Sequence, residues 1–443
     1  MNIPKIAYWP KQIFDWMHKG SSAGILLVMV TILALLGTNS PWSASFIDFW
    51  HMKLGLNIGT FQFEMSLHHL INDGLMTGFF FLVGLEIKRE MVRGELREVR
   101  RALLPIAAAV GGMVVPALIY LLVLPSSLSE AKSGWGIPMA TDIAFVVGFL
   151  ALLGPRVPKS LKLFVLTLAI VDDIGAILVI ALFYTAEISF LALGIAALLL
   201  VTVWVMQKAL VRSIPLYLLV GFAVWICFLK AGIHPTIAGV ILGLMTPAHP
   251  WEEQEKKVLR LTRFIGASDR HAIEPSALAE LATASQKALI PLDVLEARLH
   301  PFILLGVMPL FALANAGIVI DADALLSPTA IAVFSGLWIG KPLGILLASA
   351  FVIRCGWSRL PTGVSWWSLA GAASLCGIGF TMSIFVAGLA LPQHLLDAGK
   401  GGTLIASVAS ALLGLSFLTM TLQGAAPRSG RGLFRSRVKA KLK

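Results

Sequence analysis

The chain has 443 residues, of which 57% are hydrophobic and only 13% are charged. Soluble domains carry roughly 25% charged residues, and here a mean hydropathy of +0.85 excludes an ordinary soluble protein of that length. The formal net charge of +11 comes from basic residues scattered over connecting segments, which argues against a nucleic-acid partner.

Twelve apolar stretches follow one another, several of them near the roughly 20 residues that cross a bilayer. We therefore expect an all-α integral membrane protein, with one transmembrane domain at residues 1–423 and a basic tail at 424–443. The first, seventh and eighth stretches are short, so ten or eleven spans are alternatives. The stretches are Ala23–Leu36, Leu67–Leu85, Ala102–Leu124, Gly136–Leu153, Leu161–Tyr184, Phe190–Met206, Pro215–Leu229, Pro235–Met245, Phe302–Val319, Pro328–Ile353, Trp366–Leu391 and Leu404–Gln423.

The basic residues support this arrangement. With twelve spans, nearly all of the 35 Lys and Arg residues fall on one side of the membrane. Positive-inside bias makes that side the cytoplasm, and both termini are expected there. The tail from Arg428 is expected to meet anionic lipid headgroups or to be solvated. The exceptions are Lys53, Lys132, Lys230 and Lys400 on the opposite side and Lys341 within a span.

Two of the segments that connect the apolar stretches are predicted to contain secondary structure. Residues 53–64 alternate apolar and polar side chains around Asn57-Ile58-Gly59, which predicts an external β-hairpin. A lone hairpin is marginal in water, so we expect it to pair with the same element of a second subunit. Residues 247–299 are charge-mixed and are expected to form a long cytoplasmic loop with helical stretches near Glu252–Phe264 and Pro275–Leu299.

Gly and Pro interrupt the fourth span between Gly134 and Asp142 and the eleventh between Leu375 and Thr381. Unpaired backbone survives at membrane depth only beside protein or a water-filled cavity. The broken helices should leave dipole ends in the membrane. Asp142 can neutralise positive ends, and Lys341 is the one base available within the spans for negative ends.

Asp172 and Asp173 are the strongest functional signal. They lie side by side within the apolar run Leu161–Tyr184, where an ionised carboxylate costs roughly 2.5–3.5 kcal/mol. Carboxylates suit hard cations such as sodium and lithium and also accept protons. Cation and proton would compete for the same oxygens, and that competition produces exchange. Lys341 is either a counter-ion to one of these aspartates or a fixed charge beneath a broken-helix end.

The remaining charged candidates lie nearer the membrane surfaces. Asp73 is near the outer end of the second span and is either an entrance residue or a helix cap. Glu86, Lys88, Arg89 and Glu90 close that span at the cytoplasmic face, as a solvated salt-bridged surface or as a proton-responsive filter. No cofactor is indicated. Cys227, Cys355 and Cys376 lie too far apart for a metal or redox motif.

Several motifs together resemble the NhaA family of sodium/proton antiporters. They are Gly84-Leu-Glu86-Ile-Lys88-Arg89-Glu90, Ala140-Thr141-Asp142-Ile-Ala-Phe145, Val171-Asp172-Asp173-Ile-Gly175, Phe311-Ala-Leu-Ala-Asn315-Ala-Gly317, Gly340-Lys341-Pro342 and Leu375-Cys-Gly-Ile-Gly-Phe-Thr381. The likeness runs from about Asn39 to Thr421. Interrupted segments in matching halves of a chain mark the binding site in several transporter folds, and NhaA is one of these folds. The interrupted spans and the family resemblance are therefore not independent indications of a transport site.

The resemblance implies twelve helices with an inverted repeat, whose broken fourth and eleventh helices cross at mid-membrane. It implies that Asp173 is the principal sodium ligand, with Asp172 and Thr141 nearby, and that Asp172 exchanges between sodium and a salt bridge with Lys341. Asp142 would compensate the crossed helix ends. The hairpin would be the homodimerisation element. A cytoplasmic pH-sensing cluster would comprise Glu86, Arg89, Glu90, Glu296 and His300.

The chain also departs from the family pattern. Ala297 stands where a second histidine is common, and Asp293 and Val294 stand where basic residues are usual.

The aspartate pair and the resemblance together lead us to expect an electrogenic antiporter of the bacterial inner membrane that expels sodium or lithium in exchange for protons. Two alternatives differ in class. One is a sodium-coupled symporter of an organic anion, and the other is an intramembrane aspartyl protease.

Overall fold

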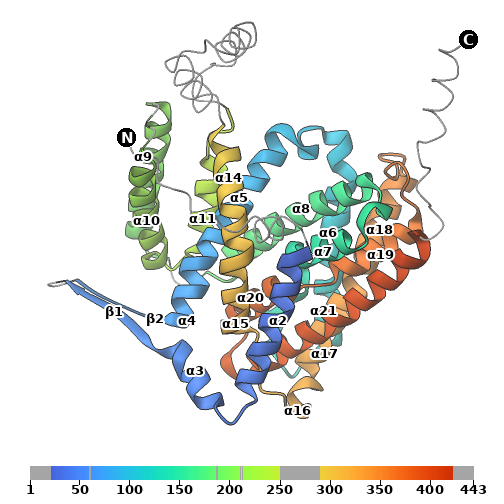
Figure 1. Cartoon of the computed structure of the whole chain (residues 1–443), viewed down its shortest axis with the longest axis horizontal. Coiled ribbons are helices and arrows are strands. Elements are labelled where there is room, and N and C mark those ends of the chain that lie inside the picture. Colours follow the sequence, from blue (N-terminus) through green and yellow to red (C-terminus); the bar gives the residue numbers. More distant parts are fainter. Residues whose placement is uncertain are drawn as a thin grey trace, which may run out of the picture.

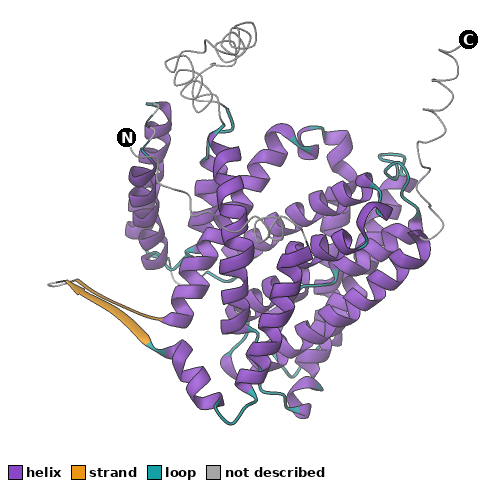
Figure 2. Cartoon of the chain, viewed as in Figure 1, coloured by secondary structure: helices purple, strands orange, loops and turns teal. Residues whose placement is uncertain are grey.

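The computed structural model describes residues 21–58, 61–185, 188–209, 211, 213–249 and 290–422. Most of these residues are helical, and one small two-stranded sheet projects from the helical body (Figure 2). The expected loop helix Glu252–Phe264 and the basic tail from Arg428 lie outside the described residues.

The helices and strands run in the following order along the chain (Figure 1). They are α2 (Ser21–Thr38), α3 (Ser43–His51), β1 (Lys53–Ile58), β2 (Phe61–Ser66), α4 (Leu67–His69), η1 (Leu70–Leu75), α5 (Met76–Arg93), η2 (Glu95–Arg97), α6 (Val99–Val123), η3 (Glu130–Met139), α7 (Ile143–Leu152), η4 (Gly154–Arg156), α8 (Lys159–Phe183), α9 (Phe190–Lys208), α10 (Ile214–Lys230), α11 (Thr236–Met245), α14 (Pro291–Phe302), η5 (Ile303–Val307), α15 (Met308–Asn315), α16 (Ala322–Leu325), α17 (Pro328–Ser335), η6 (Gly336–Gly340), α18 (Lys341–Arg354), α19 (Trp366–Cys376), α20 (Phe380–Ala390) and α21 (Gln393–Leu422).

Within the described residues, eight helical segments are long and apolar enough to cross a membrane, and ten are if each of two bent pairs counts as one span. One bent pair is α2 with α3, at 112°, and the other is α19 with α20, at 46°. The expected seventh and eighth spans correspond to α10 and α11, which are apolar but short. The protein is thus a multi-pass helical membrane protein.

Two spans begin eleven residues earlier than the hydrophobic pattern predicted. The ninth starts at Pro291, where α14 runs through η5 into α15, instead of at Phe302. The twelfth starts at Gln393, well before Leu404. Charged residues had marked both extensions as loops. Their charges are compensated by partners instead. Asp293 and Glu296 of α14 pair with arginines of α5, and the buried Lys400 interacts electrostatically with Asp397 of the same helix.

Glycines allow the tightest helix contacts. Gly84 of α5 lies against the backbone of Val240 and Gly243 in α11, and Gly239 lies against the Thr77 carbonyl. A Cβ at any of these glycines would collide with backbone atoms. Small residues let helix backbones approach closely, which matters in a membrane because lipid supplies no hydrophobic drive for helix association.

The predicted β-hairpin is present. β1 and β2 pair antiparallel with Lys53 opposite Ser66 and Ile58 opposite Phe61, so the second strand extends two residues beyond the predicted end. Figure 1 shows the hairpin pointing away from the helices. It leads directly into α4 and the π-helical turn η1, so its base lies next to the residues around Asp73.

Candidate cation and proton site

The site is built where two helices break. The fourth span consists of η3, an extended stretch from Ala140 to Asp142, and then α7. The 3₁₀ form of its first half was not predicted. The eleventh span breaks between α19 and α20 at Gly377–Gly379. The two breaks contact each other, because Asp142 N donates to Ile378 O at 2.8 Å and Thr141 Oγ1 donates to Cys376 O at 3.0 Å.

Asp142 caps both helices that start at these breaks. Its Oδ1 accepts from Phe145 N at 3.3 Å in α7, and its Oδ2 accepts from Thr381 N at 3.1 Å in α20. The Thr381 hydroxyl also donates to Oδ2. Helix N-termini carry partial positive charge and unpaired N–H groups. A single buried carboxylate therefore satisfies two N-termini.

Two serines that the sequence analysis did not single out form further hydrogen bonds with backbone groups at these helix ends. Ser407 Oγ, from α21, accepts from Phe380 N at 3.2 Å. Ser383 Oγ, from α20, donates to Ile137 O at 2.8 Å, near the carboxyl end of η3. Both side chains are buried. Their positions gave no signal in the sequence, because isolated serines are common in apolar helices.

Lys341 lies at the carboxyl end of η3. Its Nζ donates to Met139 O and to Asp172 Oδ2, and its side chain is fully buried. The π-helical turn η6 directly precedes it. Gly340 lies against Pro116 and Gly336 against Pro138, so η6 fits tightly between α6 and η3. Lys341 therefore meets both a negative helix end and an aspartate, the two partners that the sequence left as alternatives.

Asp172 and Asp173 both point into the protein from α8, with exposed fractions of 0% and 1%. Asp172 is paired with Lys341 through Oδ2, but its Oδ1 has no hydrogen-bond partner among the described residues. The same holds for Oδ1 of Asp173. Buried carboxylate oxygens are rarely left unpartnered, because desolvation without a hydrogen bond is costly. These two oxygens can accept a proton or a cation.

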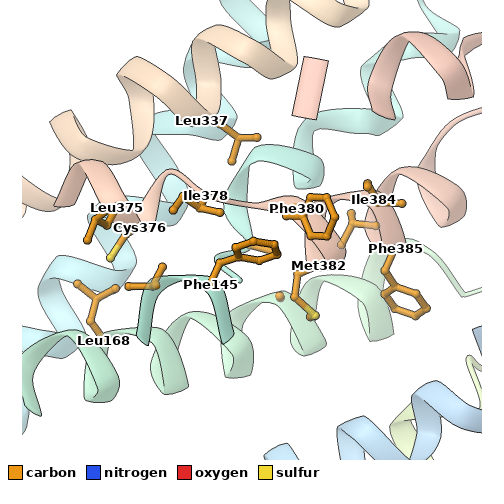
Figure 3. Close-up of a cluster of buried hydrophobic side chains, with 14 of the residues drawn as sticks. Phe145, Leu168, Leu337, Leu375, Cys376, Ile378, Phe380, Met382, Ile384 and Phe385 are labelled. Carbon is orange, nitrogen blue, oxygen red and sulfur yellow. The ribbon is translucent and has the colours of Figure 1, made fainter. Parts of the chain in front are cut away.

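Apolar side chains surround the breaks (Figure 3). The rings of Phe145 and Phe380 meet edge to face with centroids 4.8 Å apart. Phe385 contacts Phe80 of α5 and Phe311 of α15 at centroid distances of 5.5 and 6.1 Å. The two helix breaks therefore lie within a well-packed apolar core.

The predicted cytoplasmic cluster is partly assembled. Arg89 of α5 donates to Glu296 of α14 and lies 3.6 Å from Glu90. Glu90 accepts from Glu95 N at 3.1 Å. Glu86 is half-buried on the same helix and interacts electrostatically with Glu296, Arg89 and Glu90. His300 lies on α14, with an exposed side chain.

A second ion pair at this face was missed. Arg93 makes two hydrogen bonds to Asp293, both at 3.0 Å. The sequence had marked Asp293 only as an acidic residue where basic ones are usual. Arg93 stands one helical turn after Arg89, and Asp293 stands three residues before Glu296. Because each pair of like charges is about one helical turn apart, a second ion pair beside the one between Arg89 and Glu296 could have been predicted from the sequence.

Asp73 lies at the opposite end of the same span, half-buried in η1. Within the part of the chain that the structure describes, no side-chain cap hydrogen bond is found at the start of η1 or of α5. The Asp73 carbonyl oxygen accepts from the Thr77 hydroxyl and from Trp225 Nε1, the latter at 3.0 Å. The capping alternative is thus not supported by the hydrogen bonds of this turn.

Comparison with known proteins identifies the family. Residues 15–418 match the family described as Na+/H+ antiporter 1. A Na(+)/H(+) antiporter NhaA of Rhodopirellula baltica is 45% identical over 95% of this chain and 96% of its own length. Antiporters of the same name from Rhizobium meliloti and Vibrio vulnificus, the latter numbered NhaA 2, are 46% and 43% identical over 93% of this chain and 94% and 93% of their own lengths. The chain therefore belongs to the Na+/H+ antiporter 1 family and is a secondary transporter, not an enzyme.

Proposed function

We propose that this protein exchanges sodium or lithium for protons and uses the inward proton gradient to expel the cation from a bacterial cytoplasm. The carrying observation is the pair of buried aspartates, each with an oxygen that has no hydrogen-bond partner among the described residues. An ionised carboxylate in that position must be compensated by a cation or neutralised by a proton. Family membership supports the same exchange and leaves no support for the protease alternative.

In this proposal Asp173 is the principal ligand of the cation, because Asp172 already holds Lys341. Asp172 and the Thr141 hydroxyl oxygen are the next oxygens available. When sodium binds, Asp172 turns from Lys341 toward the cation, and when sodium leaves, Asp172 can pair with Lys341 again. Asp142 holds the two helix starts in place throughout the cycle.

We propose that transport is electrogenic. Two carboxylates can load two protons from one side and release them for one monovalent cation on the other. Either Asp172 or Lys341 carries the second proton, since interacting groups titrate as a set. Membrane potential should then change the rate of exchange in proteoliposomes, and a rate unaffected by an imposed potential would contradict the stoichiometry.

The architecture proposed for the intact protein has twelve spans forming one transmembrane domain at residues 1–423. It contains an inverted repeat and two broken helices that cross at mid-membrane. Both termini face the cytoplasm, as does the side on which α11 ends and α14 begins. The hairpin joins two subunits into a homodimer. Asp73 lies at the external entrance, and Glu86, Arg89, Glu90, Glu296 and His300 adjust activity to pH.

The decisive variant is Asp173→Asn. Purified protein is placed in proteoliposomes containing a pH-sensitive dye, and sodium-induced proton movement is scanned across pH. We expect the variant to lose cation exchange while keeping its thermal unfolding temperature. Asp321→Asn is the matched control, because Asp321 is an exposed aspartate that caps only the short helix α16. Normal sodium-dependent proton movement by Asp173→Asn would refute the assignment.

A binding measurement tests the competition directly. Calorimetric titration of detergent-solubilised protein with sodium should give an affinity that falls as pH is lowered, because protons occupy the same oxygens. Sodium affinity that stays constant across pH would exclude a shared site.

A further inference from the structure

We propose that Asn72, Asn315 and Trp225 are positioning residues that hold Asp73 at the outer mouth of the cation pathway. They thereby set the apparent affinity for external sodium. The inference rests on the proposed function and adds residues to which that function gives no role.

The turn that carries Asp73 is unusual. The chain forms a π-helix at Leu70–Leu75, and Met76 N donates to Ile71 O instead of to the carbonyl four residues back. Such turns insert one extra residue into a helix and are frequent at functional sites. Because a π-turn has weaker intrinsic stability than an α-helix, it persists only where neighbouring groups hold it.

Helix α15 holds this turn from one side. Asn315 Nδ2 donates to Asn72 Oδ1 at 2.8 Å, and Asn72 Nδ2 donates back to Asn315 Oδ1 at 3.3 Å. The two amides thus form a reciprocal pair. His68 Nε2 lies 3.0 Å from the same Asn315 oxygen. Asn315 is buried, so these contacts occur away from bulk water and are difficult to replace.

Helix α10 holds the turn from another side. The buried Trp225 donates its indole N–H to Asp73 O at 3.0 Å, and the Thr77 hydroxyl donates to the same carbonyl. Phe222 stacks on Trp225 with ring centroids 5.6 Å apart, which fixes the indole orientation. The backbone at Asp73 is therefore tied to α10, and the neighbouring Asn72 is tied to α15.

The carboxylate of Asp73 takes part in none of these hydrogen bonds. The hydrogen bonds from α10 and α15 to this turn go to the Asp73 carbonyl and the Asn72 amide, so they hold the backbone and not the charged group. The carboxylate itself interacts electrostatically with the neighbouring His69. The turn follows directly on the hairpin, at the end expected to face outward. A half-buried carboxylate held there can attract a cation arriving from outside.

The test separates affinity by side. Sodium-dependent proton movement is measured in right-side-out vesicles, which expose the outer face, and in everted vesicles, which expose the cytoplasmic face. We expect Asn315→Ala and Trp225→Phe each to raise the apparent KM for sodium at the outer face about tenfold, as for loss of one buried hydrogen bond. The KM at the cytoplasmic face and kcat should stay near wild type. Trp225→Phe retains the packing of an aromatic ring, so it still tests the inference if Asn315→Ala does not fold.

Asn39→Ala is the matched control. Asn39 Nδ2 donates to Ile318 O at 2.8 Å, and Asn39 Oδ1 accepts from Ile320 N at 2.9 Å. Among the described residues, its hydrogen bonds go to α2 and to this segment after α15, and none goes to η1. The variant should leave both KM values unchanged. A rise in outer KM with Asn39→Ala equal to that of Asn315→Ala would show a general structural effect and overturn the inference.

A double-mutant cycle identifies the route of the effect. If Asn315 acts through Asp73, then Asn315→Ala should add nothing in an Asp73→Asn background. Additive effects would overturn the inference, as would equal changes of KM at both faces. Absence of sodium-dependent exchange in wild-type protein would instead refute the proposed function itself, so the two failures are distinguishable.

Discussion

Lys341 and Asp172 form an ion pair in which neither side chain is exposed, although 169 residues separate them in the chain. α18 supplies the lysine and α8 the aspartate. The pair also brings a cation to the carboxyl end of η3, because Lys341 Nζ donates to Met139 O. One ammonium group thus links three of the elements that build the candidate site.

Removal of Lys341 alone should destabilise the protein strongly. Lys341→Gln leaves Asp172 buried without its counter-ion, and loss of one partner of a buried pair costs about 3–5 kcal/mol. We expect a clear fall in the thermal unfolding temperature of the detergent-solubilised protein. The double variant Asp172→Asn/Lys341→Gln should recover most of this loss.

Lys162→Gln is the control for this prediction. Lys162 also lies in a membrane helix and bonds a backbone carbonyl, Gly154 O at 3.3 Å, but it is only partly buried. Its substitution should leave the unfolding temperature nearly unchanged. A loss of stability in the double variant as large as in Lys341→Gln would show that the unpaired charge is not the cause.

Asp142→Ala should cost more than the loss of an ordinary helix cap. A single N-cap contributes roughly 0.5–2 kcal/mol, and Asp142 caps α7 and α20 together. We expect a loss of about 2–4 kcal/mol in the free energy of unfolding. Asp321→Ala, which removes the cap of one short exposed helix, should cost less than half as much. Equal losses would contradict a shared cap.

The charged residues of the candidate site could be identified from the sequence because they are conspicuous. Asp142, Asp172, Asp173 and Lys341 stand in long apolar runs, where chance seldom leaves an ionisable residue. The helix breaks were equally visible, since Gly and Pro mark them. The helical, membrane-spanning character of the chain followed from hydropathy, which is a strong signal over some 20 residues. The predicted number of spans, twelve, stays a prediction, because eight to ten segments of the described residues are long and apolar enough to cross a membrane.

The polar pairs could not be predicted in the same way. Asn72 and Asn315 are 243 residues apart, and single asparagines carry no pattern that names a partner. Nothing in the sequence pattern around Ser383 and Ser407 indicates their hydrogen-bond partners either. The early start at Pro291 was missed because Asp293 and Glu296 lower the hydropathy, and only the packing of α14 on α5 shows how these charges are paired.

His234 should make stability depend on pH. It lies between α10 and α11, and burial lowers its pKa below the ordinary value of 6.5. The unfolded chain therefore binds a proton at a higher pH than the folded protein does, so stability is lost as pH falls below 6.5. We expect the unfolding temperature of wild type to drop more steeply between pH 6.5 and 5 than that of His234→Gln, with the two curves parallel above pH 7. Parallel curves at all pH values would show that His234 does not contribute.

The ion pair between Arg93 and Asp293 should depend on charge complementarity more than on residue identity. Arg93→Asp places two acids together at the interface of α5 and α14 and should lower sodium-driven exchange in everted vesicles. The double variant Arg93→Asp/Asp293→Arg restores opposite charges and should recover most of the activity. The effect on unfolding free energy should be below about 1 kcal/mol, because both side chains are over a third exposed and solvent screens the pair. Exchange that stays low in the swapped variant, at normal protein levels, would show that Asp293 has a role beyond this pairing.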